Sequence, residues 1–206
     1  MIKFVYFDLG GVTICDFSGT NKWQEMKKIM GVKEDFDKEF DQLYDQYEKN
    51  DCPTVHVDTL IPTLSKKFDM HFSPEFSLQK YFVEHFEKNL SLWPIIDKFQ
   101  QSCKVGLLTN MYPGLFNSIR DHHLLPPTKW DLIIDSTIVL LQKPDPKIYK
   151  LAEEKCGFRG DEILFIDDRQ KNIDTAKLFG WQTFLYDPAN PQESSRELLQ
   201  FWKTRS

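Results

Sequence analysis

The sequence predicts an α/β fold in which a mostly parallel sheet carries helices on both faces. One observation is that short apolar runs alternate with helical patterns from Ser91 onward, and such alternation is typical of parallel sheets. The other is an early apolar run at residues 2–7, which a long stretch of helical spacing separates from that region. We therefore expect an all-helical segment to be inserted directly after the first strand.

The inserted segment runs from Val12 to about Asn89 and has apolar residues at helical spacing. Breaks fall at Gly31, at residues 50–53 and at Ser73, which would cap a helix that opens with Pro74. The pattern predicts about four helices and no strand within this segment. The apolar groups are Phe36, Phe40, Leu43, Tyr44 and Tyr47, then Leu60, Ile61, Leu64 and Phe68, then Phe82, Val83, Phe86 and Leu90.

The second half of the chain divides into alternating elements. Strands are predicted where short apolar runs occur, and helices where apolar residues recur at helical spacing or where a glycine follows the pattern, as at Gly157 and Gly180. The predicted strands are 104–108, 131–134, 163–166 and 182–186, and the predicted helices are 92–101, 113–121, 145–156, 172–179 and 194–203.

Composition limits the classes of function. Apolar residues make up 41% and charged residues 28% of the 206 residues, as in ordinary globular proteins. The net charge of −5 and the scattered basic residues give no reason to expect nucleic acid or a membrane as partner. No apolar run approaches the length of a membrane-spanning helix.

The expected location is cytoplasmic. The chain reaches Asp8 too early for the apolar region of a signal peptide. Its four cysteines are far apart, without a CxxC pair, and are expected to be free thiols in a reducing compartment. The sequence does not indicate an oligomeric state.

Acidic residues follow two of the predicted strands. Asp8 closes the first apolar run, and Asp167 and Asp168 close the run at residues 163–166. Burying an unpaired charge is costly, and the carboxyl ends of parallel strands are where ligands bind. If the two strands are neighbours, the carboxylates meet at ~4 Å spacing and repel one another strongly. A hard divalent cation is their natural partner.

Further polar segments fall at or just beyond predicted strand ends. Thr109 and Asn110 follow the second strand, Lys143 opens a Lys-Pro-Asp-Pro loop, and Asn172 lies four residues after Asp168. Each segment alone is weak evidence, because such residues are common in turns and caps. Their joint order and spacing are far more specific.

With these segments the sequence resembles the haloacid dehalogenase (HAD) superfamily, and in particular its phosphatase-rich branch with a helical cap. The resemblance covers nearly the whole chain. It implies a Rossmann-like core from residues 1–14 and 91–206 and a helical cap from residues 15–90. A site this charged works best when water is excluded, and an insertion after the first strand is placed to act as a lid. We therefore expect hinge strands near residues 15–18 and 88–92 and a cap that moves as a body on ligand binding.

The resemblance also implies a role for each polar segment. Asp8 would be the nucleophile that forms an aspartyl-phosphate. Mg²⁺ would be held by Asp8, by the main-chain carbonyl of Gly10, and by Asp167 and Asp168. Asn172 would not bind the metal itself but would orient the acidic loop that carries its ligands.

The remaining segments would bind the phosphoryl group. Thr109 would offer its hydroxyl and Asn110 its backbone N–H. Lys143 would stabilise the negative charge of the transition state and offset the acidic cluster.

One position departs from the family pattern. The family has a second aspartate two residues after the nucleophile, which protonates the leaving group, and here that position is Gly10. A placed general acid contributes about 10²–10⁴-fold to a rate. Metal binding through the main-chain carbonyl survives the change, whereas efficient cleavage of poor alkoxide leaving groups is in doubt.

The resulting expectation is a Mg²⁺-dependent phosphohydrolase that acts on a small phosphorylated metabolite. Two alternatives stay open at this point. A non-catalytic or regulatory member of the same fold is supported by Gly10. A metal-independent 2-haloacid dehalogenase would use the same aspartate, although Asp167 and Asp168 argue against a site without a cation. Sugar phosphates, nucleotides and phosphorylated small acids all remain possible substrates.

Overall fold

The structure, a computed structural model, describes residues 1–205. Its centre is a five-stranded sheet with the order β5-β4-β1-β6-β7, and every neighbouring pair of strands is parallel. The predicted α/β fold with a mostly parallel sheet is therefore confirmed. The strands are β1 (Phe4–Phe7), β4 (Lys104–Thr109), β5 (Leu132–Asp135), β6 (Ile163–Asp167) and β7 (Gln182–Leu185).

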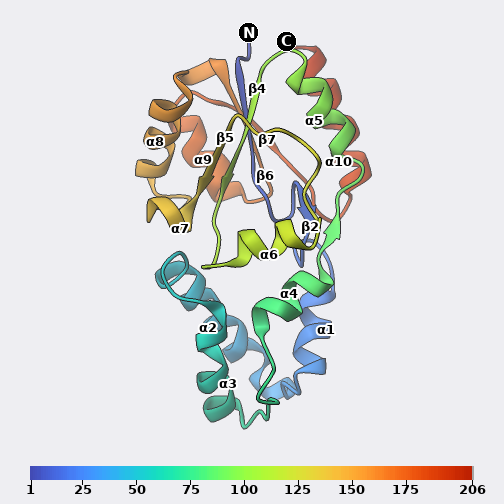
Figure 1. The fold of residues 1–206 in the computed structure, drawn as a ribbon, viewed down its shortest axis with the longest axis vertical. Coiled ribbons are helices and arrows are strands. Elements are labelled where there is room, and N and C mark those ends of the chain that lie inside the picture. Colours follow the sequence, from blue (N-terminus) through green and yellow to red (C-terminus); the bar gives the residue numbers. More distant parts are fainter. Residues whose placement is uncertain (206) are drawn as a thin grey trace.

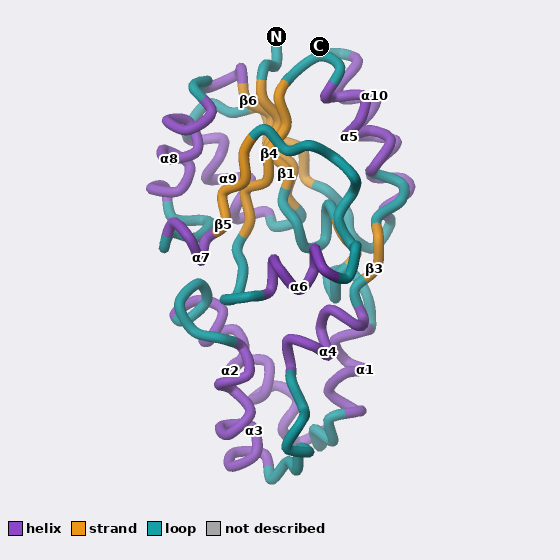
Figure 2. Tube along the Cα trace, viewed as in Figure 1, coloured by secondary structure: helices purple, strands orange, loops and turns teal. Residues whose placement is uncertain are grey.

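Helices cover both faces of this sheet (Figures 1 and 2). Side chains alternate along β1, so that Val5 and Phe7 face α5 and α10, whereas Phe4 and Tyr6 face α8 and α9. Both faces are buried, which explains why the strands appear in the sequence as unbroken apolar runs. The helices of this part are α5 (Trp93–Gln100), α6 (Leu115–Asp121), α7 (Ser136–Val139), α8 (Pro146–Cys156), α9 (Gln170–Leu178) and α10 (Pro191–Lys203), with a short 3₁₀ helix at Gly160–Glu162.

The inserted helices lie beyond the carboxyl ends of the strands, at the end of the molecule opposite both termini (Figure 1). They pack around buried aromatic and aliphatic side chains, and this cluster continues into the core through Met111, Tyr112 and Leu115. The helices are α1 (Lys22–Ile29), α2 (Asp37–Asn50), α3 (Ile61–Phe68) and α4 (Leu78–His85), with 3₁₀ turns at Glu34–Phe36 and Val57–Leu60.

A short two-stranded ribbon joins the inserted helices to the core. Strand β2 (Ile14–Cys15) pairs antiparallel with β3 (Glu87–Lys88). The expectation of no strand in the inserted segment is wrong at this ribbon, because strands of two residues are too short to produce an alternating pattern. Cys15 and Lys88 fall within the ranges 15–18 and 88–92 that were expected to form hinge strands, whereas Ile14 and Glu87 lie one residue before them.

Two local predictions also need correction. Ser73 does not cap a helix; the chain turns there, and the helix begins at Leu78 with Ser77 accepting a hydrogen bond from the Lys80 N–H. Helix α7 was not expected, because four residues are too few to show helical spacing. It is capped by Asp135, whose carboxylate accepts a hydrogen bond from the Thr137 N–H.

Other expectations concern the chain as a whole. The four cysteines carry free thiols. Among residues 1–205, no helix combines the length and the apolar character needed to cross a membrane.

Candidate active site

The sheet brings the predicted polar residues to one edge. Strand β1 lies between β4 and β6, and the Asp8 N–H donates a hydrogen bond to the carbonyl of Ile166 at 2.8 Å. Asp8, Thr109 and Asp167 therefore stand at the carboxyl ends of three adjacent strands. From β1 the sheet continues through β4 and β5 on one side and through β6 and β7 on the other. Open α/β sheets bind ligands at such a point, where the strand order reverses.

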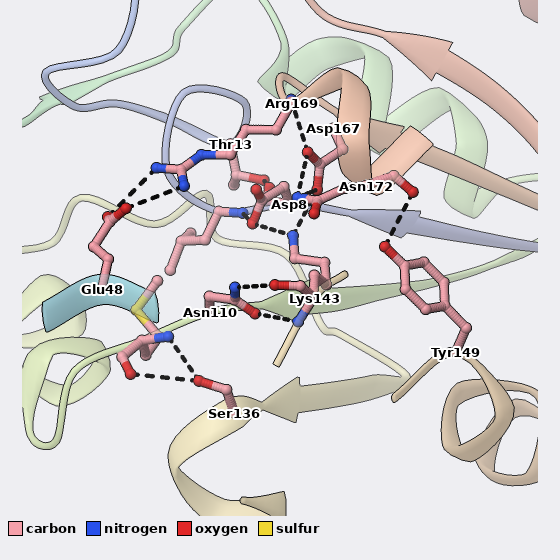
Figure 3. Close-up of polar contacts among 12 residues, drawn as sticks. Asp8, Thr13, Glu48, Asn110, Ser136, Lys143, Tyr149, Asp167, Arg169 and Asn172 are labelled. Atoms are coloured by element: carbon pink, nitrogen blue, oxygen red, sulfur yellow. Dashed lines mark hydrogen bonds and ion pairs between the residues drawn. The ribbon is translucent and has the colours of Figure 1, made fainter. Parts of the chain in front are cut away.

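Three carboxylates and one lysine form the centre of this edge. Figure 3 labels the lysine, Lys143, and two of the carboxylates, Asp8 and Asp167. Asp8, Asp167 and Asp168 each offer an oxygen, and these oxygens lie within 4.8 Å of one another. The Lys143 ammonium lies between two of them, 2.9 Å from Asp8 Oδ1 and 2.6 Å from Asp167 Oδ2. One lysine does not neutralise three carboxylates, so the cluster keeps an excess of negative charge.

Burial makes this excess charge costly. Removal from water raises the pKa of Asp8 well above its ordinary value, although Lys143 acts in the opposite direction. Burial also raises the pKa of Asp168, and the neighbouring Asp167 raises it further. Burial alone would lower the pKa of Lys143, but the two carboxylates outweigh it and raise that pKa, so the lysine stays charged. The site therefore favours any added positive charge, whether a proton or a cation.

Both carboxylate oxygens of Asp167 accept hydrogen bonds. Its Oδ1 accepts hydrogen bonds from the Arg169 N–H at 2.8 Å and from the Asn172 side-chain amide at 2.9 Å. The carbonyl of Asn172 in turn accepts a hydrogen bond from the Tyr149 hydroxyl at 3.0 Å (Figure 3). Asn172 thus lies directly against the acidic loop, and its amide also donates to Asp167 Oδ2, the oxygen that Lys143 binds.

Thr109, the last residue of β4, and Asn110, which follows it, have different environments. The Thr109 hydroxyl is buried and has no hydrogen-bond partner within residues 1–205. The Asn110 side chain is fully used, because it accepts from the Lys143 N–H at 2.8 Å and donates to the Lys143 carbonyl at 2.9 Å. Asn110 therefore fixes the backbone of the lysine loop, a role that its position in the sequence did not suggest.

The loop after Asp8 packs closely against two other carboxylates. Gly11 has a φ of +70°, and a Cβ at this residue would lie 2.6 Å from Asp168 Oδ2. Gly10 has an ordinary backbone conformation, but a Cβ there would lie 2.4 Å from Asp16 Oδ2. The loop is held back against β1 by Thr13, whose hydroxyl donates to the carbonyl of Asp8.

A cavity of about 730 Å³ opens above the acidic edge. Its volume suits a small-molecule ligand. The core contributes the polar end of the cavity, and the inserted helices contribute an aromatic wall with several carboxylates. The wall includes Phe17, Trp23, Tyr44, Phe82 and Phe86, together with Asp45 and Glu48.

An ion pair crosses this cavity from the core to α2. Two nitrogens of Arg169 lie 3.2 and 3.4 Å from the carboxylate oxygens of Glu48 (Figure 3). The Tyr112 hydroxyl also donates to Glu48, at 3.2 Å. Sequence reasoning missed this contact. Arg169 follows the acidic pair directly, which could have marked it as a site residue, whereas nothing in the sequence distinguishes Glu48 or Asp16.

Comparisons with known proteins identify relatives of this chain. A phosphatase from Mycobacterium tuberculosis is 23% identical over 198 residues, which cover 90% of this chain and 88% of that protein. The mouse acyl-CoA dehydrogenase family member 10 is 27% identical over 95 residues, which cover 45% of this chain and only 9% of that much longer protein.

Solved structures have the same fold. A HAD family enzyme from Bacteroides thetaiotaomicron, solved with magnesium and inorganic phosphate, has a TM-score of 0.68 at 19% identity. The likeness covers 90% of this chain and 94% of that enzyme. An L-2-haloacid dehalogenase has a TM-score of 0.65 at 19% identity, and the likeness covers 90% of this chain and 84% of that protein. The model of the haloacid dehalogenase-like hydrolases matches residues 2–180. The chain therefore belongs to the haloacid dehalogenase-like hydrolase family.

Proposed function

We propose that this hydrolase is a Mg²⁺-dependent phosphatase that cleaves a small phosphorylated metabolite through an aspartyl-phosphate on Asp8. The observation that carries the proposal is the cluster of Asp8, Asp167 and Asp168, whose carboxylate oxygens lie within 4.8 Å of one another beside a buried lysine. Such a cluster has the charge to bind a cation and, with that cation, a phosphate group.

The donor atoms fit a hard divalent cation, because all of them are oxygens. Asp8, Asp168 and the main-chain carbonyl of Gly10 would hold the ion directly. Both oxygens of Asp167 are engaged, one by Lys143 and the other by Asn172 and a backbone N–H, so we assign Asp167 to contact through water. Bound Mg²⁺ supplies positive charge that neutralises the carboxylates and holds a phosphoryl oxygen.

The chain's own residues provide the rest of the chemistry. A carboxylate oxygen of Asp8 attacks phosphorus, the bond from phosphorus to the leaving oxygen breaks, and water later releases phosphate from the aspartyl-phosphate. Lys143 is 2% exposed and adds positive charge next to the transferring group. The unpartnered Thr109 hydroxyl is free to donate a hydrogen bond to a phosphoryl oxygen, and the Asn110 N–H lies next to it in the chain.

The relatives support this reaction class. The full-length match in Mycobacterium tuberculosis is described as a phosphatase, and the Bacteroides thetaiotaomicron enzyme binds magnesium and inorganic phosphate. In this chain the aromatic wall of the cavity faces the acidic edge, so it would contact the part of the metabolite that carries the phosphate.

A metal-independent 2-haloacid dehalogenase is the alternative that the fold also accommodates. Such an enzyme uses its aspartate on carbon and binds an anionic substrate without a cation. The charges of Asp167 and Asp168 next to Asp8 would oppose both tasks. Release of halide from a 2-haloacid in the presence of EDTA would favour this alternative.

Hydrolysis of p-nitrophenyl phosphate tests the proposal. We expect activity with Mg²⁺, loss of activity with EDTA, no measurable activity in Asp8→Asn and a severe loss in Asp168→Asn. Asp35→Asn, which neutralises an exposed carboxylate outside the cavity, is the matched control and should keep full activity. Full activity in EDTA or in Asp8→Asn would refute the mechanism. A panel of phosphorylated metabolites would then identify the substrate.

A further inference from the structure

The carboxylate of Asp16 occupies the space that a side chain at position 10 would fill. A Cβ built on Gly10 would lie 2.4 Å from Asp16 Oδ2 and 3.3 Å from its Cγ. Standard bond lengths put a carboxylate oxygen about 2.4 Å from the Cβ of its own aspartate. Asp16 Oδ2 is thus as far from the Gly10 Cβ position as an oxygen of an aspartate at position 10 would be.

The position of Asp16 in the chain allows this approach. It directly follows β2, where the chain leaves the core for the inserted helices. Its Oδ1 accepts a hydrogen bond from the Ser18 N–H at 2.8 Å, which fixes the carboxylate. Asp16 lines the same cavity as Asp8 and Lys143. The carboxyl group is therefore held at the reacting end of the cavity.

We infer that Asp16 is the general acid of this enzyme and replaces the side chain that Gly10 lacks. This inference rests on the proposed phosphatase function. As Asp8 attacks phosphorus and the bond to the leaving oxygen breaks, the Asp16 carboxyl gives its proton to that oxygen, and a neutral alcohol leaves. The Asp16 carboxylate then takes a proton from the water that attacks the aspartyl-phosphate, which releases phosphate and restores both side chains.

The arrangement also links proton transfer to the position of the inserted helices. An acid at position 10 would belong to the core, whereas Asp16 stands on the connection between the core and α1. The proton donor therefore reaches the leaving group only when this connection lies against Gly10, as it does here.

The dependence of rate on leaving group tests the inference. The unmodified enzyme should cleave alkyl phosphates and p-nitrophenyl phosphate at rates that depend only weakly on leaving-group pKa. Asp16→Asn, which keeps an acceptor for Ser18, should lower the single-turnover rate of alcohol release from alkyl phosphates by about 10²–10⁴-fold. The single-turnover release of p-nitrophenol, which needs no proton, should fall by less than about tenfold. Asp35→Asn again serves as the control.

A double variant moves the acid to the other position. Gly10→Asp alone should not raise activity, because its Cβ meets the Asp16 carboxylate. Gly10→Asp combined with Asp16→Ala removes that contact and should recover alkyl phosphate turnover relative to Asp16→Ala. This recovery distinguishes a lost acid from a damaged fold, and thermal unfolding of each variant provides the stability comparison.

The two failures are distinguishable. If the unmodified protein hydrolyses phosphate esters with Mg²⁺ and requires Asp8, but Asp16→Asn lowers the single-turnover release of aryl and alkyl leaving groups equally or leaves both unchanged, the role of Asp16 is refuted and the phosphatase function stands. A steep leaving-group dependence in the unmodified enzyme also refutes the role of Asp16. If the unmodified protein hydrolyses no phosphate ester, both proposals are refuted.

Discussion

At the scale of single residues, the site depends on how closely its carboxylates approach one another and the glycine loop. The Lys143 ammonium lies 2.9 Å from Asp8 Oδ1 and 2.6 Å from Asp167 Oδ2, and it offsets part of their negative charge. Gly11 lets Asp168 approach the loop, because any side chain there would collide with its carboxylate. The glycine loop therefore has little room for a side chain. The site also keeps a net negative charge that a cation would neutralise.

Replacing Gly11 with alanine should therefore weaken metal binding as well as stability. The left-handed backbone at Gly11 costs a residue with a side chain about 1–2 kcal/mol, and the new Cβ would displace the carboxylate 2.6 Å away. We expect a loss of at least about tenfold in Mg²⁺ affinity, measured by calorimetry. Gly157→Ala is the control, since φ is +78° there and nothing lies within 4 Å of its Cβ position. Equal Mg²⁺ affinity in the two variants would contradict this view.

The raised pKa values of Asp8 and Asp168 predict a pH-dependent effect of Mg²⁺ on stability. A carboxyl with a higher pKa in the folded than in the unfolded state keeps its proton only when folded, so the metal-free protein loses stability as pH rises through that range. On the proposed function, bound Mg²⁺ would replace these protons. The rise in Tm on adding saturating MgCl₂ should be larger at about pH 8 than at about pH 5, and Asp168→Asn should reduce the difference. The same rise at both pH values would rule out this linkage.

Some residues of the site could be predicted from sequence and others could not. Asp8, Asp167 and Asp168 each follow an apolar strand, so their meeting follows from strand order alone. Asp16 and Glu48 reach the site from the inserted helices and their connection, and their approach depends on tertiary packing that no local pattern records. When only the sequence around position 10 is considered, Gly10 indicates that the general acid is missing.

At the scale of elements, the contact between α2 and the core closes one side of the cavity. Glu48 on α2 binds both Arg169 and Tyr112, which belong to the core. On the opposite side, β2 and β3 connect the same two parts of the chain. We expect the inserted helices to move as a body about this ribbon, with the Arg169 ion pair holding the closed arrangement.

Glu48→Gln should weaken closure with little effect on stability. Both partners of the ion pair are partly exposed, so its contribution to stability is below about 1 kcal/mol. We expect a several-fold rise in KM, and faster hydrogen exchange in α2 when Mg²⁺ and a phosphate analogue are bound. Glu39→Gln removes a similar exposed ion pair to Lys67 that lies wholly within the inserted helices. If the control changes KM as much, the ion pair to Arg169 has no special role in closure.

Element boundaries were predictable where a pattern had room to repeat. In the core, the strands of four to six residues and the helices of seven or more were predicted close to their observed bounds. The pattern did not show the two-residue strands β2 and β3 or the four-residue helix α7, because their hydrogen bonds depend on partners distant in the chain or on one cap. Hinge strands near β2 and β3 were expected only from the place of the inserted segment. These short elements adjoin the site and the connection to the inserted helices.

At the scale of the whole molecule, the residues proposed for chemistry and those proposed for substrate recognition lie on different parts of the chain. The parallel sheet holds Asp8, Lys143 and the acidic pair on a rigid edge, and the inserted helices supply the aromatic wall that would meet the rest of the substrate. The alternation of strands and helices was enough to predict the sheet. The sequence could not predict the shape of the cavity, because the packing of the inserted helices on Met111, Tyr112 and Leu115 determines it.

The central claim is that a phosphoryl group is transferred to Asp8. The most direct measurement is mass spectrometry of the peptide containing Asp8, after rapid acid quenching of the enzyme during turnover of a phosphate ester with Mg²⁺. The proposed mechanism predicts a phosphoryl group on Asp8 that is absent with EDTA and absent in Asp8→Asn. Steady release of phosphate by an Asp8→Asn variant, or a phosphoryl group trapped on a different residue, would contradict it.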